Sequence, residues 1–225
     1  MVTNLAYFYE TSRKTRGGKW VWVKDSNGEM RGNVLLGGTI LNPKKGFDHL
    51  YAAQLVQYTP AQGCLIFRSF GVKTATAAAT DTIIYINGDG YSDAPEVGML
   101  IMKAPTVATA AGQSALVTNV EYDSANEWFK VTLDTALGSL AVGDILVEAS
   151  GEEASAEASV LVPNPNTFVE ADRDLMPTEG FGLTGTANYS ISTVYNKQAW
   201  IARMQPLPAY VLANNRSLIE GIFWI

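Results

Sequence analysis

Two segments of the chain, PEVGMLIMKA at residues 95–104 and LAVGDILVEA at residues 140–149, share one pattern. In each, Val-Gly and one variable residue precede an apolar run that is typical of a strand. Glycine adopts backbone angles that residues with a Cβ atom avoid, so we expect Gly98 and Gly143 to form structural turns into two strands. We expect the valine before each glycine to fill the core. Two equivalent corners, 45 residues apart, predict a pseudo-symmetric body that resembles a small β-barrel or β-clip.

The clearest local signal is a β-hairpin. Residues 114–122 and 128–133 both alternate between two kinds of side chain with a period of two, and the turn-forming sequence DSAN joins them. Further runs rich in aromatic and β-branched residues predict additional strands, whereas residues 51–58 fit either a strand or a short helix. These runs are residues 6–9, 19–24, 33–36, 65–72, 82–86, 100–102 and 145–149. The predicted fold class is therefore mainly all-β.

Composition excludes several classes of protein. An apolar fraction of 47% and a charged fraction of 17% are not those of a disordered chain, and they suggest that partners cover part of the surface. No run approaches the roughly 18 apolar residues that a membrane span requires, and the N-terminal residues do not read as a secretion signal. We therefore expect a soluble product made in the cytoplasm, with no membrane partner.

Charge is distributed unevenly along the chain. Residues 1–50 contain eight Lys or Arg and four Asp or Glu, whereas residues 74–180 contain three basic and seventeen acidic residues. This asymmetry predicts a basic docking segment and a solvated acidic body, although a solubilising surface alone is an alternative interpretation. The basic cluster consists of Arg13, Lys14, Arg16 and Lys19. Nucleic acid is not the expected partner, because the acidic body repels phosphates.

The pattern predicts three regions. Residues 1–73 are expected to be a β-rich, extended N-terminal docking segment, and residues 74–160 a β-barrel-like body. The low-complexity sequence TATAAAT at residues 74–80 is expected to be a linker or neck between them. Residues 161–225 are expected to form an extended, proline-containing crossing and C-terminal strands that complete the body or a subunit interface.

The last four residues are all apolar, which is unusual for a chain end. They are Ile222, Phe223, Trp224 and Ile225. Either the same subunit covers them, or they form a subunit interface, where aromatic residues are enriched. We assign them to the subunit interface as a hypothesis.

Few residues favour catalysis. Cys64 is the only cysteine and lies in an apolar run, so we expect a buried thiol. His49 is the only histidine. We therefore expect neither a metal site with several His or Cys ligands nor a Ser-His-Asp catalytic triad. The paired acids Glu152 and Glu153 lie in an Ala/Ser/Glu-rich segment that is typical of a solvated loop. We therefore expect no enzymatic activity.

A metal or a cofactor is not expected either. Asn87, Asp89 and Asp93 carry oxygen ligands at alternating positions, but this segment lacks the distal bidentate glutamate of a calcium loop. The neighbouring Gly-Asp-Gly sequence is not a phosphate-binding loop, because no GxxxxGK[ST] pattern surrounds it. We interpret it as a tight turn.

The layout of the second half of the chain is similar to that of a known class of protein. The stretch VGMLIMKAPTVATAAGQSALVTNVEYDSANEWFKVTLDTALGSLAVGDILVEA, a Pro/Asn-rich crossing and the terminal RSLIEGIFWI resemble bacteriophage head fibre and capsid decoration proteins, particularly those of phages that infect Bacteroides. The resemblance covers roughly residues 75–225 and rests on layout and hairpin style. It implies a β-rich homotrimer on the capsid surface of the virion, assembled in the bacterial host cytoplasm and attached by its N-terminal part.

The expected function is therefore decoration of the phage capsid as an oligomeric structural protein, with the major capsid protein as partner. The basic cluster, together with Trp20 and Trp22, is expected to dock on the capsid, since aromatic and Arg side chains are effective interface anchors. One rival hypothesis is a host-surface or glycan-binding fibre domain that uses loops near Tyr91 and Asn126. The second rival hypothesis is a β-rich hydrolase. Hydrolytic activity that disappears when one acidic residue is mutated would support it.

Overall fold

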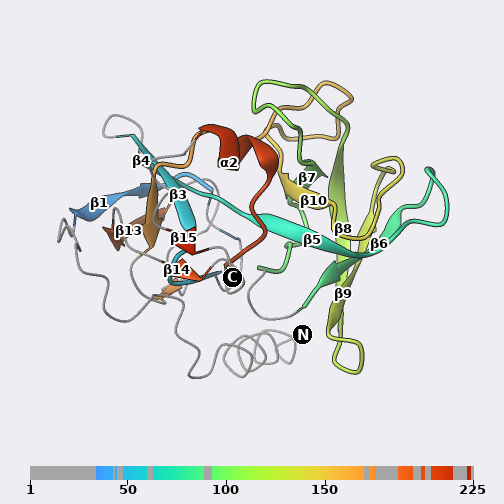
Figure 1. The fold of residues 1–225 in the computed structure, drawn as a ribbon, viewed down its shortest axis with the longest axis horizontal. Coiled ribbons are helices and arrows are strands. Elements are labelled where there is room, and N and C mark those ends of the chain that lie inside the picture. Colours follow the sequence, from blue (N-terminus) through green and yellow to red (C-terminus); the bar gives the residue numbers. More distant parts are fainter. Residues whose placement is uncertain are drawn as a thin grey trace. The chain divides into compact units, whose positions relative to one another are not determined.

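The computed structural model describes most of the chain between residues 34 and 223. The described residues are 34–42, 44, 48–59, 63–88, 93–169, 173–175, 187–194, 199–200, 204–214 and 222–223. The chain divides into two compact units. The central unit consists of Arg68–Pro163 and Gln205–Asn214, and the terminal unit consists of Met1–Phe67, Asn164–Met204 and Asn215–Ile225. Both units are built mainly from β-strands (Figure 1), so the predicted fold class is confirmed.

Six strands form a closed barrel in the central unit, in the order β10-β5-β6-β9-β8-β7. Side chains alternate between the interior and the outer surface, as the pleat of a strand requires. In β9, for example, Phe129, Val131 and Leu133 are buried and the residues between them are half-buried. The strands are β5 (Ser69–Thr74), β6 (Ile83–Asn87), β7 (Leu100–Lys103), β8 (Ser114–Asp123), β9 (Trp128–Leu133) and β10 (Ile145–Glu148). The predicted hairpin of residues 114–133 is present as β8 and β9.

The barrel consists of two halves with the same strand pairing: β5, β6 and β7 form the first half, and β8, β9 and β10 form the second. Val72 pairs with Ile86 in the first half as Val117 pairs with Leu133 in the second. Immediately after Val72, and again immediately after Val117, the register shifts by a β-bulge. Bulges bend a strand and increase its twist, which favours closure of a small barrel. A β-bulge therefore lies at the equivalent position in both halves.

The two halves meet along two seams. Along one, β7 pairs with β10 about Met102 and Val147, and along the other, β6 pairs with β9 about Ile84 and Val131. If each residue is replaced by its equivalent in the other half, the residue pairs along both seams stay the same. A pseudo-two-fold axis through these two pairs therefore relates the halves, and the repeated sequence pattern reflects a repeated structure.

The repeated glycines lie at equivalent turns. Gly98 and Gly143 have φ values of 92° and 87°, which residues with a Cβ atom rarely adopt. Each is the third residue of a β-turn closed by a backbone hydrogen bond, a position that requires positive φ in type II turns. Four further backbone hydrogen bonds attach the turns to the barrel: Gly98 N–H to Val117 C=O, Val117 N–H to Met99 C=O, Gly143 N–H to Val72 C=O, and Val72 N–H to Asp144 C=O.

The expected role of the two valines is wrong. Val97 is 51% exposed and Val142 is 69% exposed, so neither fills the core. Each occupies the second position of its β-turn. Backbone hydrogen bonds of the glycine, and not an apolar plug, hold each turn in place.

Two expectations about the start of the body are also wrong. Residues 75–82 do not link two regions, because they connect β5 to β6 inside one barrel. The expected single strand at residues 65–72 is two strands, β4 (Gly63–Ile66) and β5. Phe67 bonds through its N–H to Leu55 in the terminal unit, whereas the carbonyl of Arg68 accepts from Glu148 in the central unit. The first boundary between units therefore falls between residues 67 and 68, and further boundaries fall at 163/164, 204/205 and 214/215.

The terminal unit contains a closed five-stranded barrel in the order β1-β13-β11-β3-β4. These strands are β1 (Val34–Ile40), β13 (Ala187–Val194), β11 (Thr167–Val169), β3 (Leu55–Thr59) and β4. Two further pairs are β2 (Asp48–Leu50) with β12 (Arg173–Leu175), and β14 (Ala199–Trp200) with β15 (Ile222–Phe223). Its core contains Ile40, Leu50, Val56, Cys64, Ile66 and Val169.

Asparagine side chains extend the ladders of this barrel. Between β1 and β4 only Ile40 and Cys64 pair directly. The Asn42 side chain donates to the carbonyl of Ile66 and accepts from its N–H, both at 2.8 Å. Asn166 makes the same two bonds with Tyr58, at 2.9 Å each. A side-chain amide thus takes the place of a backbone amide at both positions.

The short helix α2 (Ala209–Asn214) belongs to the central unit. Tyr210 is buried there, and its hydroxyl donates to the carbonyl of Val162 at 3.3 Å. Burial raises the pKa of this hydroxyl, so Tyr210 stays neutral. Within the described ranges, no helix has the length and hydrophobicity to cross a membrane.

Candidate functional site

Most of the predicted docking and interface side chains lie outside the described residues. Arg13, Lys14, Arg16, Lys19, Trp20 and Trp22 belong to residues 1–33, and Trp224 and Ile225 follow the last described residue. Ile222 and Phe223 form β15, which pairs in parallel with β14 of the same chain. Tyr91 and Asp89, named above for a host-binding loop and a calcium site, also fall outside the described residues. The side chain of His49 is likewise not described.

The best-defined candidate site in the described part of the chain is the outer surface of three neighbouring strands, β6, β9 and β8. Residues that alternate with the buried ones form three rows across these strands. The rows are Ile83–Thr132–Asn119, Tyr85–Lys130–Glu121 and Asn87–Trp128–Asp123. We call these nine residues the aromatic face. It combines two large rings with ionisable and amide groups on one sheet.

The rings of Tyr85 and Trp128 make contact on this face. Their centroids are 4.9 Å apart and their planes are inclined by 45°, a geometry that is favourable for aromatic pairs. Both side chains are half-buried, so each ring keeps part of its surface toward solvent. A second pair, Tyr122 and Phe129, supports the same hairpin with centroids 4.9 Å apart. Three of these four rings lie on the β8–β9 hairpin, and the fourth, Tyr85, lies on the adjacent β6.

Polar groups on the face are fixed by bonds to one another. Lys130 Nζ lies 3.5 Å from Glu121 Oε2, and the Asn119 amide donates to Glu121 Oε1 at 2.9 Å. Asp123 accepts a 2.7 Å hydrogen bond from the Asn126 side chain, which is the main cause that lowers the pKa of its carboxyl. The N–H groups of Ala125 and Asn126 and the Trp128 side chain lower it further. Asp123 is therefore ionised and held in one orientation at neutral pH.

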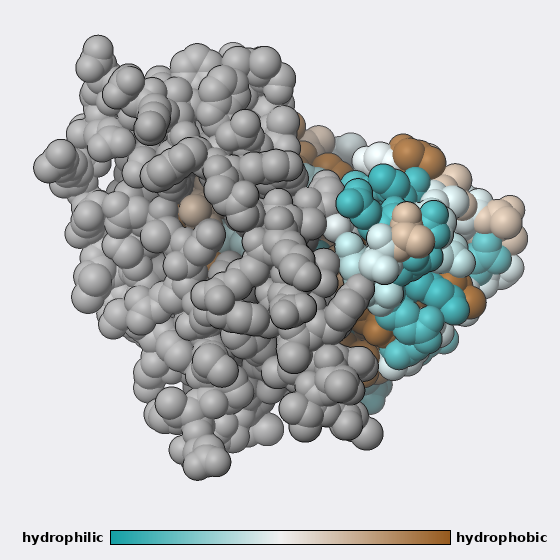
Figure 2. All heavy atoms as spheres, turned by 90° about the horizontal axis from the view of Figure 1, so that it is seen from below, coloured by the Kyte–Doolittle hydropathy of each residue, from teal (hydrophilic) through white to brown (hydrophobic). Residues whose placement is uncertain are grey.

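The hairpin that carries this face ends in an exposed turn. Ser124, Ala125, Asn126 and Glu127 are all exposed, and the tip appears as the yellow-green loop at the lower right of Figure 1. Figure 2 views the molecule from below, and the described surface on this side is largely hydrophilic with separate hydrophobic areas. On the aromatic face itself, strand pairing places polar residues beside both rings, an arrangement that suits reversible binding of a polar partner.

Sequence reasoning did not single out Tyr85 and Trp128, although a signal was available. Strand positions that alternate with buried ones are normally polar, yet both these positions are aromatic. An aromatic residue on the polar side of a strand is informative when a neighbouring strand carries another nearby. Tyr85 and Trp128 are diagonal neighbours, so the pairing of β6 with β9 was required to recognise that they are close.

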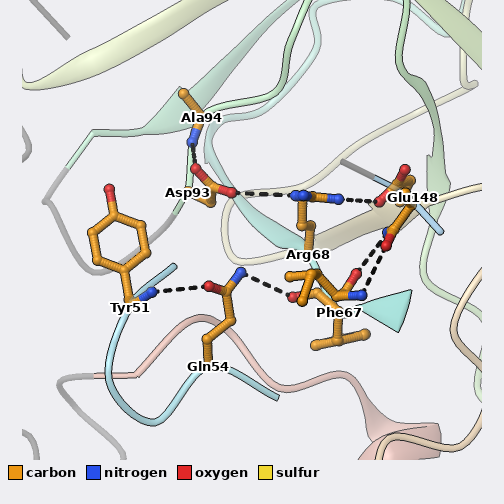
Figure 3. A network of polar contacts seen from close by, with 9 residues as sticks. Tyr51, Gln54, Phe67, Arg68, Asp93, Ala94 and Glu148 are labelled. Atoms are coloured by element: carbon orange, nitrogen blue, oxygen red, sulfur yellow. Dashed lines mark hydrogen bonds and ion pairs between the residues drawn. The ribbon is translucent and has the colours of Figure 1, made fainter. Parts of the chain in front are cut away.

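A second polar cluster is buried in the central unit (Figure 3). Arg68 has a fully buried side chain, and its Nη1 lies 3.1 Å from Glu148 Oε2 while its Nε lies 3.6 Å from Asp93 Oδ2. Asp93 also accepts from the N–H of Ala94 at 2.9 Å. Because the Arg68 side chain has no exposed surface, a substrate has no access to it. We interpret the cluster as structural, holding the start of β5 to β10.

Two further candidates for chemistry are the single cysteine and clusters of metal-ligating side chains. Burial raises the pKa of the Cys64 thiol to about 12, so this thiol is not a nucleophile near neutral pH. Among the residues that the structure describes, no three His, Cys, Asp or Glu side chains gather as metal ligands do.

Comparison with known proteins adds no relative. No model of a known protein family matches the chain, and a search of curated proteins finds no match. The candidate site therefore rests on its geometry alone.

Proposed function

We propose that this chain is a non-enzymatic structural protein of a bacteriophage virion. It docks on the major capsid protein through its basic N-terminal segment, associates as a homotrimer and displays the central unit at the capsid surface. The C-terminal residues Ile222, Phe223, Trp224 and Ile225 contribute to the subunit interface in this proposal.

The observation that supports the proposal is the order of the two units along the chain. Both chain ends belong to the terminal unit, and the six-stranded barrel is inserted between them. Such insertions let one unit keep an attachment role while the other is presented as a separate body. The charge distribution follows the same division, because the basic cluster lies in the terminal unit and the acidic stretch covers the central unit.

Capsid binding tests the docking half of the proposal. The full chain is mixed with capsids that lack it, and co-sedimentation is measured. The variant Arg13→Gln/Lys14→Gln/Arg16→Gln/Lys19→Gln is expected to bind at least tenfold more weakly, since interfacial charge contributes to encounter and affinity. Substitution is preferred to truncation at residue 73, because truncation there would remove β5 from the barrel.

The matched control neutralises lysines of the central unit instead. The variant Lys73→Gln/Lys103→Gln/Lys130→Gln is expected to bind capsids as the unmodified chain does. If the control loses binding and the N-terminal variant retains it, the assignment of docking to the basic segment is wrong. Native mass spectrometry tests the trimer, since one chain has a mass of 24.3 kDa. A monomer at every concentration would contradict the subunit interface.

A further inference from the structure

The two halves of the six-stranded barrel differ most at the aromatic face. The pseudo-symmetry matches Tyr85 with Thr132 and Trp128 with Asp81, so neither ring of the pair is repeated in the other half. It also matches β8 with β5, yet β8 has ten residues and β5 has six. Within one closed barrel, the shorter and the longer strand occupy equivalent positions. The extended, ring-bearing hairpin is therefore not required by the barrel framework.

We propose that the aromatic face is a binding site for a neutral oligosaccharide or polysaccharide. A sugar ring has apolar C–H surfaces and a rim of hydroxyl groups. Tyr85 and Trp128 offer rigid, partly exposed rings for the C–H surface, and such rings contribute contact area at low entropic cost. This proposal is independent of capsid docking, because it concerns the central unit alone.

The polar groups beside the rings match the hydroxyl rim. Asp123 and Glu121 are acceptors for hydroxyl donors, and charged acceptors form the stronger hydrogen bonds. Asn87 lies next to Trp128 in the same row, and Lys130 lies between Tyr85 and Glu121. Hydrogen bonds from Asn119 to Glu121, and from Asn126 in the adjoining turn to Asp123, orient the two carboxylates before a ligand arrives, which reduces the entropy lost on binding.

Charge selects a neutral ligand. Two carboxylates and one ammonium lie on the face, and residues 74–180 carry three basic against seventeen acidic side chains. Phosphate- or sulfate-bearing polymers are repelled by such a field. A protein partner is less suitable, because the core of a protein interface is apolar and depleted of charge. On this face Ile83 is the single large aliphatic side chain, at 43% exposed.

A glycan array probed with the full chain tests the proposal. Neutral oligosaccharides are expected to bind, and dextran sulfate and hyaluronan, the anionic probes, are not. For a neutral oligosaccharide that binds, isothermal titration with Trp128→Ala and with Tyr85→Ala is expected to show affinity at least tenfold lower. Trp128→Phe, which keeps a ring, is expected to lose less. Val142→Ala removes an exposed apolar side chain elsewhere on the barrel and is expected to change affinity less than twofold.

Four results would overturn the proposal. The first is an array on which no neutral glycan binds, and the second is an affinity that neither Trp128→Ala nor Tyr85→Ala changes. The third is a preference for the anionic probes. The fourth is binding of the chain to cell surfaces that survives periodate treatment of the cells but is lost after their treatment with proteinase. The last result would assign the face to a protein partner. Thermal unfolding of each variant shows whether it is folded, and Trp128→Phe keeps the test decisive if Trp128→Ala does not fold.

Discussion

The two halves of the six-stranded barrel share a backbone plan and differ in what they carry. Turns, bulges and seams are equivalent in the halves, whereas the side chains outside the barrel and at its ends are not. Arg68 precedes β5 in the first half as a buried cation, and Gln113 precedes β8 in the second half as an exposed amide. The β8–β9 hairpin of the second half is the longer of the two hairpins, and together with β6 it forms the aromatic face. Closure of this barrel thus depends on inward apolar residues and turn geometry, which leaves the outer positions available for other roles.

The largest expected effect on stability is at Arg68, where the two halves carry different residues. Arg68→Met removes the cation that faces the buried Asp93 and the half-buried Glu148, so we expect the free energy of unfolding to fall by about 3–5 kcal/mol. Gln113→Met changes the equivalent position, where the side chain is exposed, and is expected to cost less than about 0.5 kcal/mol. Urea unfolding of the full chain measures both. Equal losses in the two variants would show that the cluster has no special structural role.

The turn glycines test whether the halves are equivalent in energy as well as in geometry. Gly98→Ala and Gly143→Ala are each expected to lower the unfolding free energy by about 1–2 kcal/mol, because both residues have positive φ. A Cβ added at Gly143 would meet no atom within 4 Å, so the cost there comes from the backbone alone. Denaturant unfolding is the measurement, with Val142→Ala as the nearly neutral control. A clear difference between the two glycine variants would mean that the turns are equivalent only in shape.

A smaller change, a gain in stability, is expected at the turn of the longer β8–β9 hairpin. Glu127 has φ of 53°, an unfavourable value for a residue with a Cβ atom. Glu127→Gly is expected to raise the unfolding free energy by a few tenths to about 1 kcal/mol, while its carbonyl still accepts from the N–H of Gly88. Glu127→Ala, which removes the carboxylate and keeps the strain, is the control. A loss of stability in Glu127→Gly would show that backbone strain does not govern this turn.

The smallest effect concerns pH. Hydrogen bonds from Asn126 and its neighbours lower the pKa of Asp123 below its ordinary value of 3.8. The stability that this ionised group contributes is complete above about pH 4 and is lost as the pH falls through the lower, folded-state pKa. NMR titration of the Asp123 carboxyl measures the pKa directly. In Asn126→Ala the pKa is expected to move toward 3.8, and an unchanged value would exclude Asn126 as the main cause.

Local patterns predicted part of this fold. The β8–β9 hairpin follows from alternation within one short segment, and the repeated glycines follow from a pattern of a few residues. The boundary between units was missed because residues 65–72 were interpreted as one continuous strand, although Phe67 and Arg68 bond to different partners. The terminal barrel was missed because β1 pairs with β13, far along the chain, and such pairing leaves no local mark. The aromatic face was missed for the same reason.

The amino-acid sequence by itself determined the β character of the chain, its best hairpin and the positions of two turns, because period-two alternation and glycine conformation act over a few residues. The tertiary structure decided that the strands close into two barrels, that Val97 and Val142 face solvent, and that Tyr85 meets Trp128. Strand pairing brings residues together across long stretches of chain, and the neighbours that it selects decide which side chains are buried and which form a site.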